Sequence, residues 1–187
     1  TNSESFVAGL DADTGETKWK LDRTKSAVWA SPALYHPPGQ PKPQVVLQSK
    51  QGLLSIDPES GATNWEIKEA CGAIPSTTIA ERLIVTPLKA LTALEPTGTQ
   101  GTPNVLWSEG KLSPNTPTPV VYDGHVYVLK GSVLSCGDMK TGKGAGIGAV
   151  VGGVLGILGG PAGVVLGAGA GAAIGGALAH PDKGFRD

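Results

Sequence analysis

The sequence has little of what usually indicates a redox centre, a metal site or a helical domain. Aromatic residues make up only 5% of the 187 residues, and there are two cysteines and three histidines. Cys71 and Cys136 are neither adjacent nor part of a C-x-x-C motif, and no two histidines have the spacing of metal ligands. No metal site is therefore predicted, and whether the two cysteines pair stays open.

The sequence also lacks an excess of charge of either sign. Fifteen Lys and Arg residues face sixteen Asp and Glu residues, which gives a net charge of −1 and a pI of about 6.3. Nucleic-acid binding needs a basic surface, so no nucleic-acid partner is expected. The chain begins at Thr1 without a basic and apolar leader, so any secretion signal is expected to be absent or already removed.

Residues 1–143 contain no sustained helical pattern. They consist of short runs rich in Val, Leu, Ile and Tyr, such as QVVLQSK (44–50), RLIVTPL (82–88) and VVYDGHVYVLK (120–130), and Gly, Pro and Asp separate these runs. Such runs predict β-strands joined by tight turns. We therefore expect a mainly β domain over residues 1–143.

A turn motif, D-x-x-[ST]-G-x-x-x-W, recurs along this domain. Aspartate at its start can accept hydrogen bonds from the following backbone N–H groups, and glycine four residues later supplies the positive φ that closes a hairpin. The tryptophan then falls on the returning strand, where its ring can fill the wedge between stacked sheets. The motif residues are Asp11, Gly15 and Trp19; Asp57, Gly61 and Trp65; Gly98 and Trp107 of a looser copy; and Asp138 and Gly142 of a copy without tryptophan.

The spacing of the repeats indicates a propeller. Ser31, Ser76 and Thr118 open similar apolar segments, which gives a repeat of roughly 42–45 residues with about four strands in each unit. The units predicted are a half blade (4–23), blades at 28–69 and 73–111, and a blade at 117–143 that lacks its tryptophan strand. A solenoid or a sandwich is the alternative architecture.

The motif in "LDADTGETKW" and "SIDPESGATNW" resembles the repeat of PQQ-like (quinoprotein-type) β-propellers over residues 4–143. The resemblance implies a partial β-propeller of about three four-stranded antiparallel blades. Quinoprotein dehydrogenases of this group bind PQQ and calcium with an adjacent-cysteine ring, an acidic ligand set and a catalytic aspartate. This sequence has no counterpart of those motifs, so no catalytic, cofactor-binding or metal-binding residue is assigned.

The group also includes the propeller subunit of the bacterial outer-membrane protein assembly machine. The function expected from the resemblance is therefore a non-catalytic protein-binding or scaffold module. An open arc of blades exposes its sheet edges, so a protein partner, further blades or other copies of the chain are expected to cover them. The alternative is a fragment of an envelope oxidoreductase that uses PQQ and calcium.

Residues 144–179 differ from the rest because they carry no charged side chain and are rich in glycine. They resemble glycine-zipper segments of small bacterial membrane proteins and predict a hairpin of two helices (146–158 and 162–179), in which small residues allow close packing in a membrane. The glycines of the predicted packing face are Gly148, Gly152, Gly156, Gly160, Gly163, Gly167, Gly171 and Gly175. Residues 180–187 form a polar tail.

The glycine-rich segment predicts attachment to a membrane, most simply in a bacterial cell envelope. Two alternatives remain open for it, a disordered linker and an oligomeric membrane channel. The abrupt change of composition near Lys143 also leaves open an artificial fusion at that point.

Overall fold

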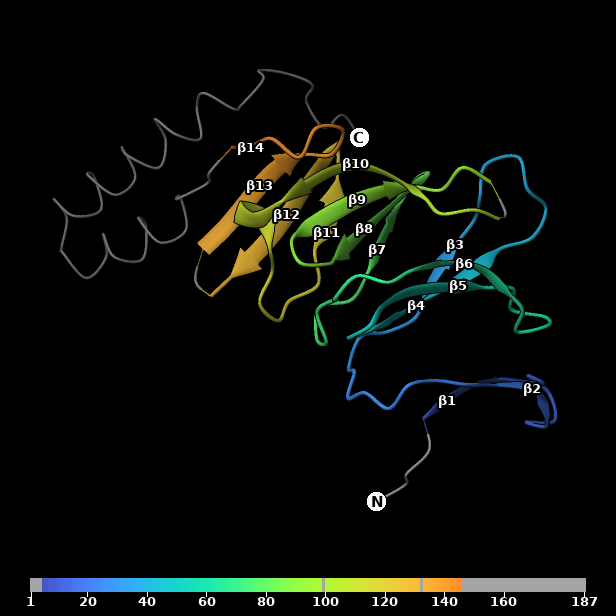
Figure 1. Ribbon diagram of the computed structural model, residues 1–187. Coiled ribbons are helices and arrows are strands. Elements are labelled where there is room, and N and C mark those ends of the chain that lie inside the picture. The colour runs from blue at the N-terminus through green and yellow to red at the C-terminus, as the bar shows by residue number, and fades with distance from the viewer. Residues whose placement is uncertain (1–4, 99, 132, 146–187) are drawn as a thin grey trace, which may run out of the picture.

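A computed structural model describes residues 5–98, 100–131 and 133–145 (Figure 1). The described chain is mainly β, with one short 3₁₀ helix, η1 (Gly110–Leu112). The strands are β1 (Phe6–Leu10), β2 (Thr17–Asp22), β3 (Ala33–Tyr35), β4 (Gln44–Ser49), β5 (Gly52–Ile56), β6 (Thr63–Ile67) and β7 (Thr78–Ala80). The chain continues through β8 (Leu83–Pro87), β9 (Leu91–Glu95), β10 (Asn104–Glu109), β11 (Val120–Tyr122), β12 (His125–Lys130), β13 (Val133–Asp138) and β14 (Gly144–Ala145).

The strands form three four-stranded antiparallel sheets and one two-stranded sheet. In each four-stranded sheet the strands lie in chain order, β3 to β6, β7 to β10 and β11 to β14, as in a propeller blade. The remaining sheet contains only β1 and β2, which confirms the half blade at the start of the domain. The last blade extends two residues past the expected boundary at 143, because Gly144 and Ala145 pair with β13.

Two hydrophobic cores lie between neighbouring blades. Strands β8 and β9 contribute to both, since Val85 and Ala93 face the core shared with the last blade while Ile84 and Leu94 face the core shared with the β3–β6 blade. All four of these side chains are fully buried. Burying a side chain the size of Val, Ile or Leu stabilises the fold by roughly 1.5–3 kcal/mol, so the β7–β10 blade holds the arc together.

The repeated Ser and Thr residues before the first strand of each complete blade link successive blades. The Ser31 N–H donates to the Ser76 hydroxyl (2.9 Å), and the Ser76 N–H donates to the Thr118 hydroxyl (3.0 Å). The sequence repeat at these positions therefore corresponds to a line of contacts from one complete blade to the next. The side chain of Thr78 adds a hydrogen bond to the Pro119 carbonyl (2.6 Å).

The half blade is packed differently from the others, because no residue of β1 or β2 is buried. Figure 1 shows this pair of strands at one end of the arc, set apart from β4 and β5.

Both Cys71 and Cys136 are free thiols in this structure.

The predicted helical hairpin of residues 146–179 and the polar tail lie outside the described residues. Of the glycine-rich segment 144–179, only Gly144 and Ala145 are described, and they form strand β14 and not a helix. Within the part of the chain that is described, no helix is long and apolar enough to cross a membrane. The membrane attachment inferred from the sequence therefore stays a prediction.

Candidate functional site

Three of the four turn motifs adopt one geometry. In the turns that begin at Asp11, Asp57 and Asp138, one carboxylate oxygen accepts hydrogen bonds of 2.8–3.1 Å from the backbone N–H groups two and three residues later. The aspartate N–H donates to the carbonyl five residues on, and the glycine N–H donates to the aspartate carbonyl. The glycines have φ between 67° and 74°, which residues with a Cβ rarely adopt.

These hydrogen bonds also set the acidity of the aspartates. The ion pair with Lys18 (2.8 Å) and the N–H groups of Thr14 and Asp13 lower the pKa of Asp11 to about 2. Hydrogen bonds from Ser60 and Glu59 lower the pKa of Asp57, and those from Thr141 lower the pKa of Asp138. The three carboxylates are therefore charged turn acceptors at neutral pH, a structural role that leaves no proton to donate.

Two of the turns bind the tryptophan of the preceding blade. The Trp19 indole donates to the Pro58 carbonyl (3.0 Å), and the Trp107 indole donates to the Met139 carbonyl (2.8 Å). Each carbonyl belongs to the residue directly after the turn aspartate. A Cβ added to Gly61 or Gly142 would lie 2.6 Å from the same indole, so each ring lies directly against a glycine.

Trp65 makes a different contact because the next turn departs from the motif. That turn begins at Glu95, and its Gly98 has a φ of 149° and no atom within 4 Å of an added Cβ. The Trp65 indole donates to the side-chain oxygen of Gln44 in its own blade (3.1 Å). The turn at Gly15 has the motif geometry but likewise no atom within 4 Å of an added Cβ.

Two recesses of the described chain lie between blades, beside Arg82. A recess of about 710 Å³ separates the last two blades, and its lining includes Leu83, Val121 and Tyr122. A second recess of about 380 Å³ lies between the first two complete blades and is lined by Pro37, Pro38 and Pro96 among others. Arg82 lines both recesses, so they open on one face, which we call the Arg82 face.

One contact within its own blade and one with the preceding blade hold Arg82 in place. Its guanidinium Nε lies 3.0 Å from a carboxylate oxygen of Glu95, and its carbonyl accepts a hydrogen bond from the buried hydroxyl of Tyr35 (3.1 Å). Burial raises the pKa of Tyr35, so this hydroxyl keeps its proton at neutral pH. The carboxyl of Glu95 therefore pairs with an arginine where the other blades have a turn-capping aspartate.

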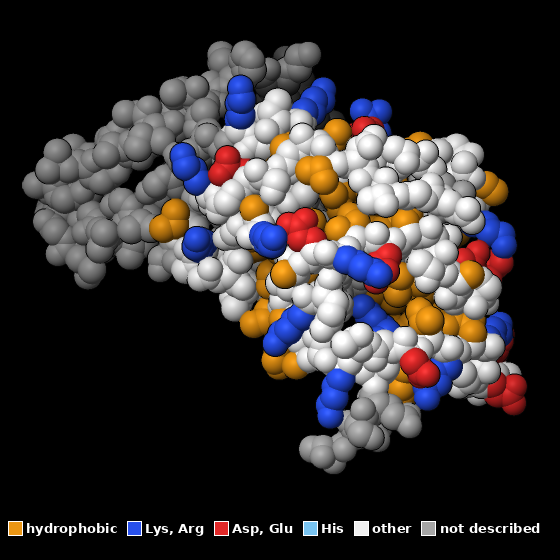
Figure 2. Space-filling model, viewed as in Figure 1, with side chains coloured by type: hydrophobic (Ala, Val, Ile, Leu, Met, Phe, Trp, Pro, Cys, Tyr) orange, Lys and Arg blue, Asp and Glu red, His pale blue; other side chains and the backbone are white. Residues whose placement is uncertain are grey.

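The lining of the larger recess combines apolar and charged side chains. Tyr122 is 69% exposed, and the charged groups around it come from Glu81, Arg82, Asp123 and Lys140. The turn from β11 to β12 has positive φ at both Asp123 (46°) and Gly124 (69°), as in a type I′ hairpin. Figure 2 shows hydrophobic side chains between Lys, Arg, Asp and Glu side chains on the viewed face.

Sequence reasoning located the turns and tryptophans but missed Arg82 and Tyr122. The pair Asp123–Gly124 was a usable hairpin signal, whereas nothing in the sequence marks Arg82, whose position depends on blades that meet only in the folded chain. Among the described residues no three His, Cys, Asp or Glu side chains could hold a metal ion together. The glycines from Gly148 to Gly175 lie outside the described residues.

Comparisons with known proteins agree with this geometry. Residues 1–80 match a PQQ-repeat family model described as outer membrane protein assembly factor BamB. No curated protein matches the sequence. Among solved structures, BamB from Moraxella catarrhalis is similar with a TM-score of 0.54 and 20% identity. The match covers 76% of this chain and 48% of BamB, so the chain spans about half the length of that structure.

At this identity the structural match concerns the fold alone. The resemblance inferred from the turn and tryptophan repeats is confirmed: residues 1–80 match the PQQ-repeat family, and the described strands have the fold of part of a BamB propeller.

Proposed function

We propose that this chain is a non-catalytic protein-binding module of a bacterial cell envelope, and that the Arg82 face binds the partner. The observation that carries the proposal is the pair of recesses on that face, one of them with the exposed ring of Tyr122 beside charged side chains. Exposed aromatic rings next to arginine are typical of the residues that dominate protein interfaces.

The comparisons support the choice of a protein as the ligand. The family model that matches residues 1–80 is described as an outer membrane protein assembly factor, and the solved relative is BamB. We therefore infer that the partner is a protein handled or assembled at the envelope. The near-neutral net charge disfavours a nucleic acid, since no excess of Lys or Arg is present to neutralise phosphates.

A photo-crosslinking residue placed at Tyr122 in the full chain tests this proposal in bacterial cells. A matched control places it at Lys68, whose side chain is 81% exposed and lines neither recess of the Arg82 face. We expect protein adducts at position 122 that decrease at least tenfold in the Arg82→Glu variant. Equal adducts at both positions, or none at position 122, would contradict the assignment of this face.

The tail is proposed to hold the module at a membrane. The uncharged, glycine-rich composition of residues 144–179 supports this proposal. Flotation of the full chain with lipid vesicles is the test, with a Leu155→Asp and Leu166→Asp double variant as the comparison. Flotation that is lost in the double variant is the expected result, and a full chain that stays in the aqueous fraction would argue against a membrane anchor.

A further inference from the structure

The linker between the half blade and the first complete blade carries an arginine without a counter-charge. Arg23 follows β2 directly, and its backbone N–H donates to the Ser5 carbonyl (2.7 Å), which fixes the start of the linker. The side chain of Arg23 is partly buried. Within the described residues, no carboxylate lies within ion-pair distance of this guanidinium.

The pKa of Arg23 reflects the same isolation. Burial lowers this pKa, and neither a hydrogen bond nor a nearby charge of the described chain opposes the effect. Arginine nevertheless stays protonated in proteins, so the linker keeps a permanent positive charge. Removing a charge from water costs free energy unless a group of opposite sign pairs with it. An anionic ligand would supply that group.

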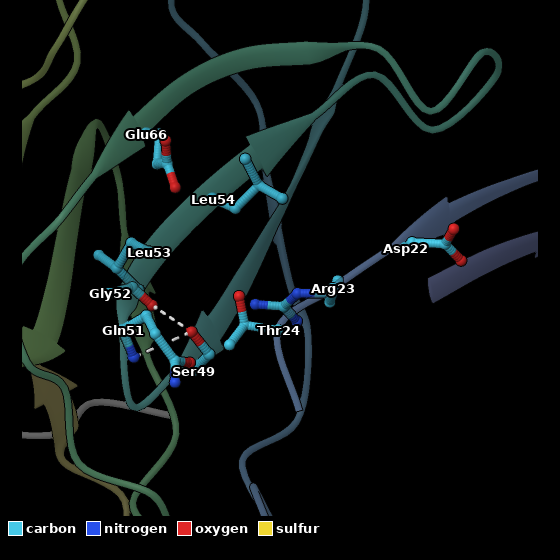
Figure 3. Close-up of a pocket in the computed structure, with 9 residues that line it drawn as sticks. All are labelled: Asp22, Arg23, Thr24, Ser49, Gln51, Gly52, Leu53, Leu54 and Glu66. Atoms are coloured by element: carbon cyan, nitrogen blue, oxygen red, sulfur yellow. Dashed lines mark hydrogen bonds between the residues drawn. The ribbon is translucent and has the colours of Figure 1, made fainter. Parts of the chain in front are cut away.

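Two adjoining recesses lie beside this linker. Their volumes are about 160 and about 250 Å³, and Arg23, Thr24 and Ser49 line both. Figure 3 shows Arg23 and Thr24 on the linker side of the smaller recess, with Ser49 and Gln51 of the β4–β5 hairpin opposite them. We call the two recesses together the Arg23 recess.

A buried hydroxyl in the same lining also lacks a partner. The side-chain oxygen of Ser26 is buried and makes no hydrogen bond in the described structure, and Ser26 lines the larger of the two recesses. Most buried polar groups in folded proteins are hydrogen-bonded, so this one requires an explanation. The Ser49 hydroxyl, in contrast, is already bonded to Gln51 and Gly52 of its own hairpin. The Arg23 recess therefore contains two donors without an acceptor.

The charges around the recess favour a carboxylate over a phosphate. Arg23 is the only Lys or Arg among the described residues that line it, while Asp22 and Glu66 line the smaller part. Figure 3 shows the Asp22 carboxylate directed away from Arg23, and Glu66 pairs with Lys68 (3.5 Å). One guanidinium matches one carboxylate, to which it can donate two parallel hydrogen bonds. A phosphate would bring more negative charge close to Asp22 and Glu66.

Apolar side chains line the rest of the recess. Leu53 and Leu54 line the smaller part, and Val7, Val28 and Leu47 line the larger part. An apolar group that covers such side chains removes apolar surface from water, which favours binding. The ligand expected from the lining is therefore a carboxylate joined to an apolar group.

We propose that the Arg23 recess is a binding site for a carboxylate with an adjacent apolar group, such as the end of a polypeptide whose last residue is apolar. Arg23 pairs with the carboxylate, Ser26 donates a hydrogen bond to an oxygen of the same ligand, and the apolar group lies against the leucine and valine side chains. No described residue lines both this recess and the recesses of the Arg82 face, so the site goes beyond the function proposed above.

The probe is the tripeptide acetyl-Ala-Val-Leu with a free carboxylate at its end, titrated into the full chain. Backbone amide signals of Thr24 and Gln51 in NMR spectra report binding. We expect a saturable shift, and at least tenfold weaker binding of the same tripeptide with an amide at its end, because the charge is then lost. Equal binding of the acid and the amide would overturn the proposal, and so would tighter binding of inorganic phosphate.

A third peptide identifies the source of the carboxylate. Acetyl-Asp-Val-Leu-amide has an acidic side chain and no free carboxylate at its end. Binding at least as tight as that of acetyl-Ala-Val-Leu would assign the site to an acidic side chain, and weaker binding would assign it to the end of a chain. Both results support a carboxylate site, provided that the acid and amide forms of the first peptide differ as expected.

Variants of the full chain test the place. Arg23→Gln should weaken binding of the acid at least tenfold, and Ser26→Ala should weaken it about threefold, because one hydrogen bond is lost. The matched control is Lys25→Gln, which removes a positive charge from the same linker although Lys25 is exposed and lines neither part of the recess. The control should bind like the wild-type chain. Equal losses in Arg23→Gln and Lys25→Gln would overturn the proposal, because general charge attraction would then explain the binding.

Acidic side chains outside the described residues are tested directly. They are Glu4, Asp182 and Asp187. A triple variant, Glu4→Gln, Asp182→Asn and Asp187→Asn, should bind the peptide like the wild-type chain. Binding that becomes at least fivefold tighter would show that one of these side chains occupies the recess, which would overturn its assignment to a ligand.

Circular dichroism and slow hydrogen exchange in β8 and β9 show that each variant is folded. Exchange in β1 and β2 that matches the wild-type chain shows that the start of the linker is intact. The Arg82→Glu variant should leave peptide binding unchanged, so the Arg23 recess and the Arg82 face can fail separately.

Discussion

Gly15 and Gly142 occupy the same place in two copies of one turn but have different neighbours. Both have positive φ, 74° and 67°, so alanine strains the backbone at either position. At Gly142 an added Cβ also meets the Trp107 ring, whereas at Gly15 nothing lies within 4 Å. The pair therefore separates the cost of backbone conformation from the cost of losing the indole contact.

We expect Gly15→Ala to destabilise the fold by about 1 kcal/mol and Gly142→Ala by about 1–3 kcal/mol more. Urea unfolding of the two variants measures the difference. Gly61→Ala also displaces an indole, that of Trp19, but this ring joins only the half blade, so the added cost there should appear mainly as faster hydrogen exchange in β1 and β2. Equal losses at Gly15 and Gly142 would show that the indole contact contributes nothing.

The two thiols should react slowly in the native protein. Burial raises the pKa of Cys71 to about 11, and it also raises the pKa of Cys136. Since the thiolate is the reactive form, Ellman's reagent at pH 8 should label both residues only after denaturation. Single Cys71→Ser and Cys136→Ser variants assign the two signals, and rapid labelling of two thiols in the native chain would contradict the buried positions.

At the scale of the element, the three aspartate turns should make stability depend on acid pH. A folded pKa below the ordinary value of 3.8 stabilises the folded state fully above about pH 4. That contribution is lost as the pH falls through the folded pKa, which for Asp11 is about 2. Asparagine can accept the same hydrogen bonds without titrating, so a triple variant of Asp11, Asp57 and Asp138 to Asn should flatten the dependence.

Urea unfolding at pH 5, 4 and 3 measures this effect. The wild-type midpoint should fall more steeply between pH 4 and 3 than that of the triple variant. Parallel curves would mean that the three aspartates have the same pKa in the unfolded chain as in the folded one. The aspartates are largely exposed, so the effect should be small at high salt.

The strands should differ widely in local stability. Every residue of β8 is buried, and so is all but the last residue of β9, whereas β1 and β2 have no buried residue. Local opening costs least where few apolar contacts are lost. Hydrogen exchange should therefore be fastest in β1 and β2 and slowest in β8 and β9, and equal rates would mean that the half blade opens only when the whole chain unfolds.

At the scale of the whole molecule, the blades are coupled mainly to their neighbours through tryptophan and the interblade cores. Trp107 is buried in the core between the last two blades, while Trp19 joins only the half blade to the next one. Trp107→Ala should lower the global free energy of unfolding by about 3–5 kcal/mol. Trp19→Ala should instead speed exchange in β1 and β2 with little change in β8 and β9.

Global unfolding by denaturant and residue-level exchange distinguish the two variants. If Trp19→Ala lowered the global stability as much as Trp107→Ala, the half blade would have to be an integral part of the cooperative unit.

Much of the fold could be predicted because its signals are local. An aspartate followed four residues later by a glycine defines a turn through bonds within six residues, and the structure has these bonds in all three copies. The turn at Glu95 was harder, since glutamate there pairs with Arg82 from the turn between β7 and β8. A pattern of residues within one turn contains no information about that contact.

The sequence by itself determined the strands, the turns and the positions of the tryptophans, because these depend on side-chain alternation and on hydrogen bonds between near neighbours. Only the tertiary structure decided which oxygen each indole meets, the Pro58 carbonyl for Trp19, the Gln44 side chain for Trp65 and the Met139 carbonyl for Trp107. It also decided the Arg82 face. These features arise where segments distant in the chain approach one another, and no local pattern specifies how closely they meet.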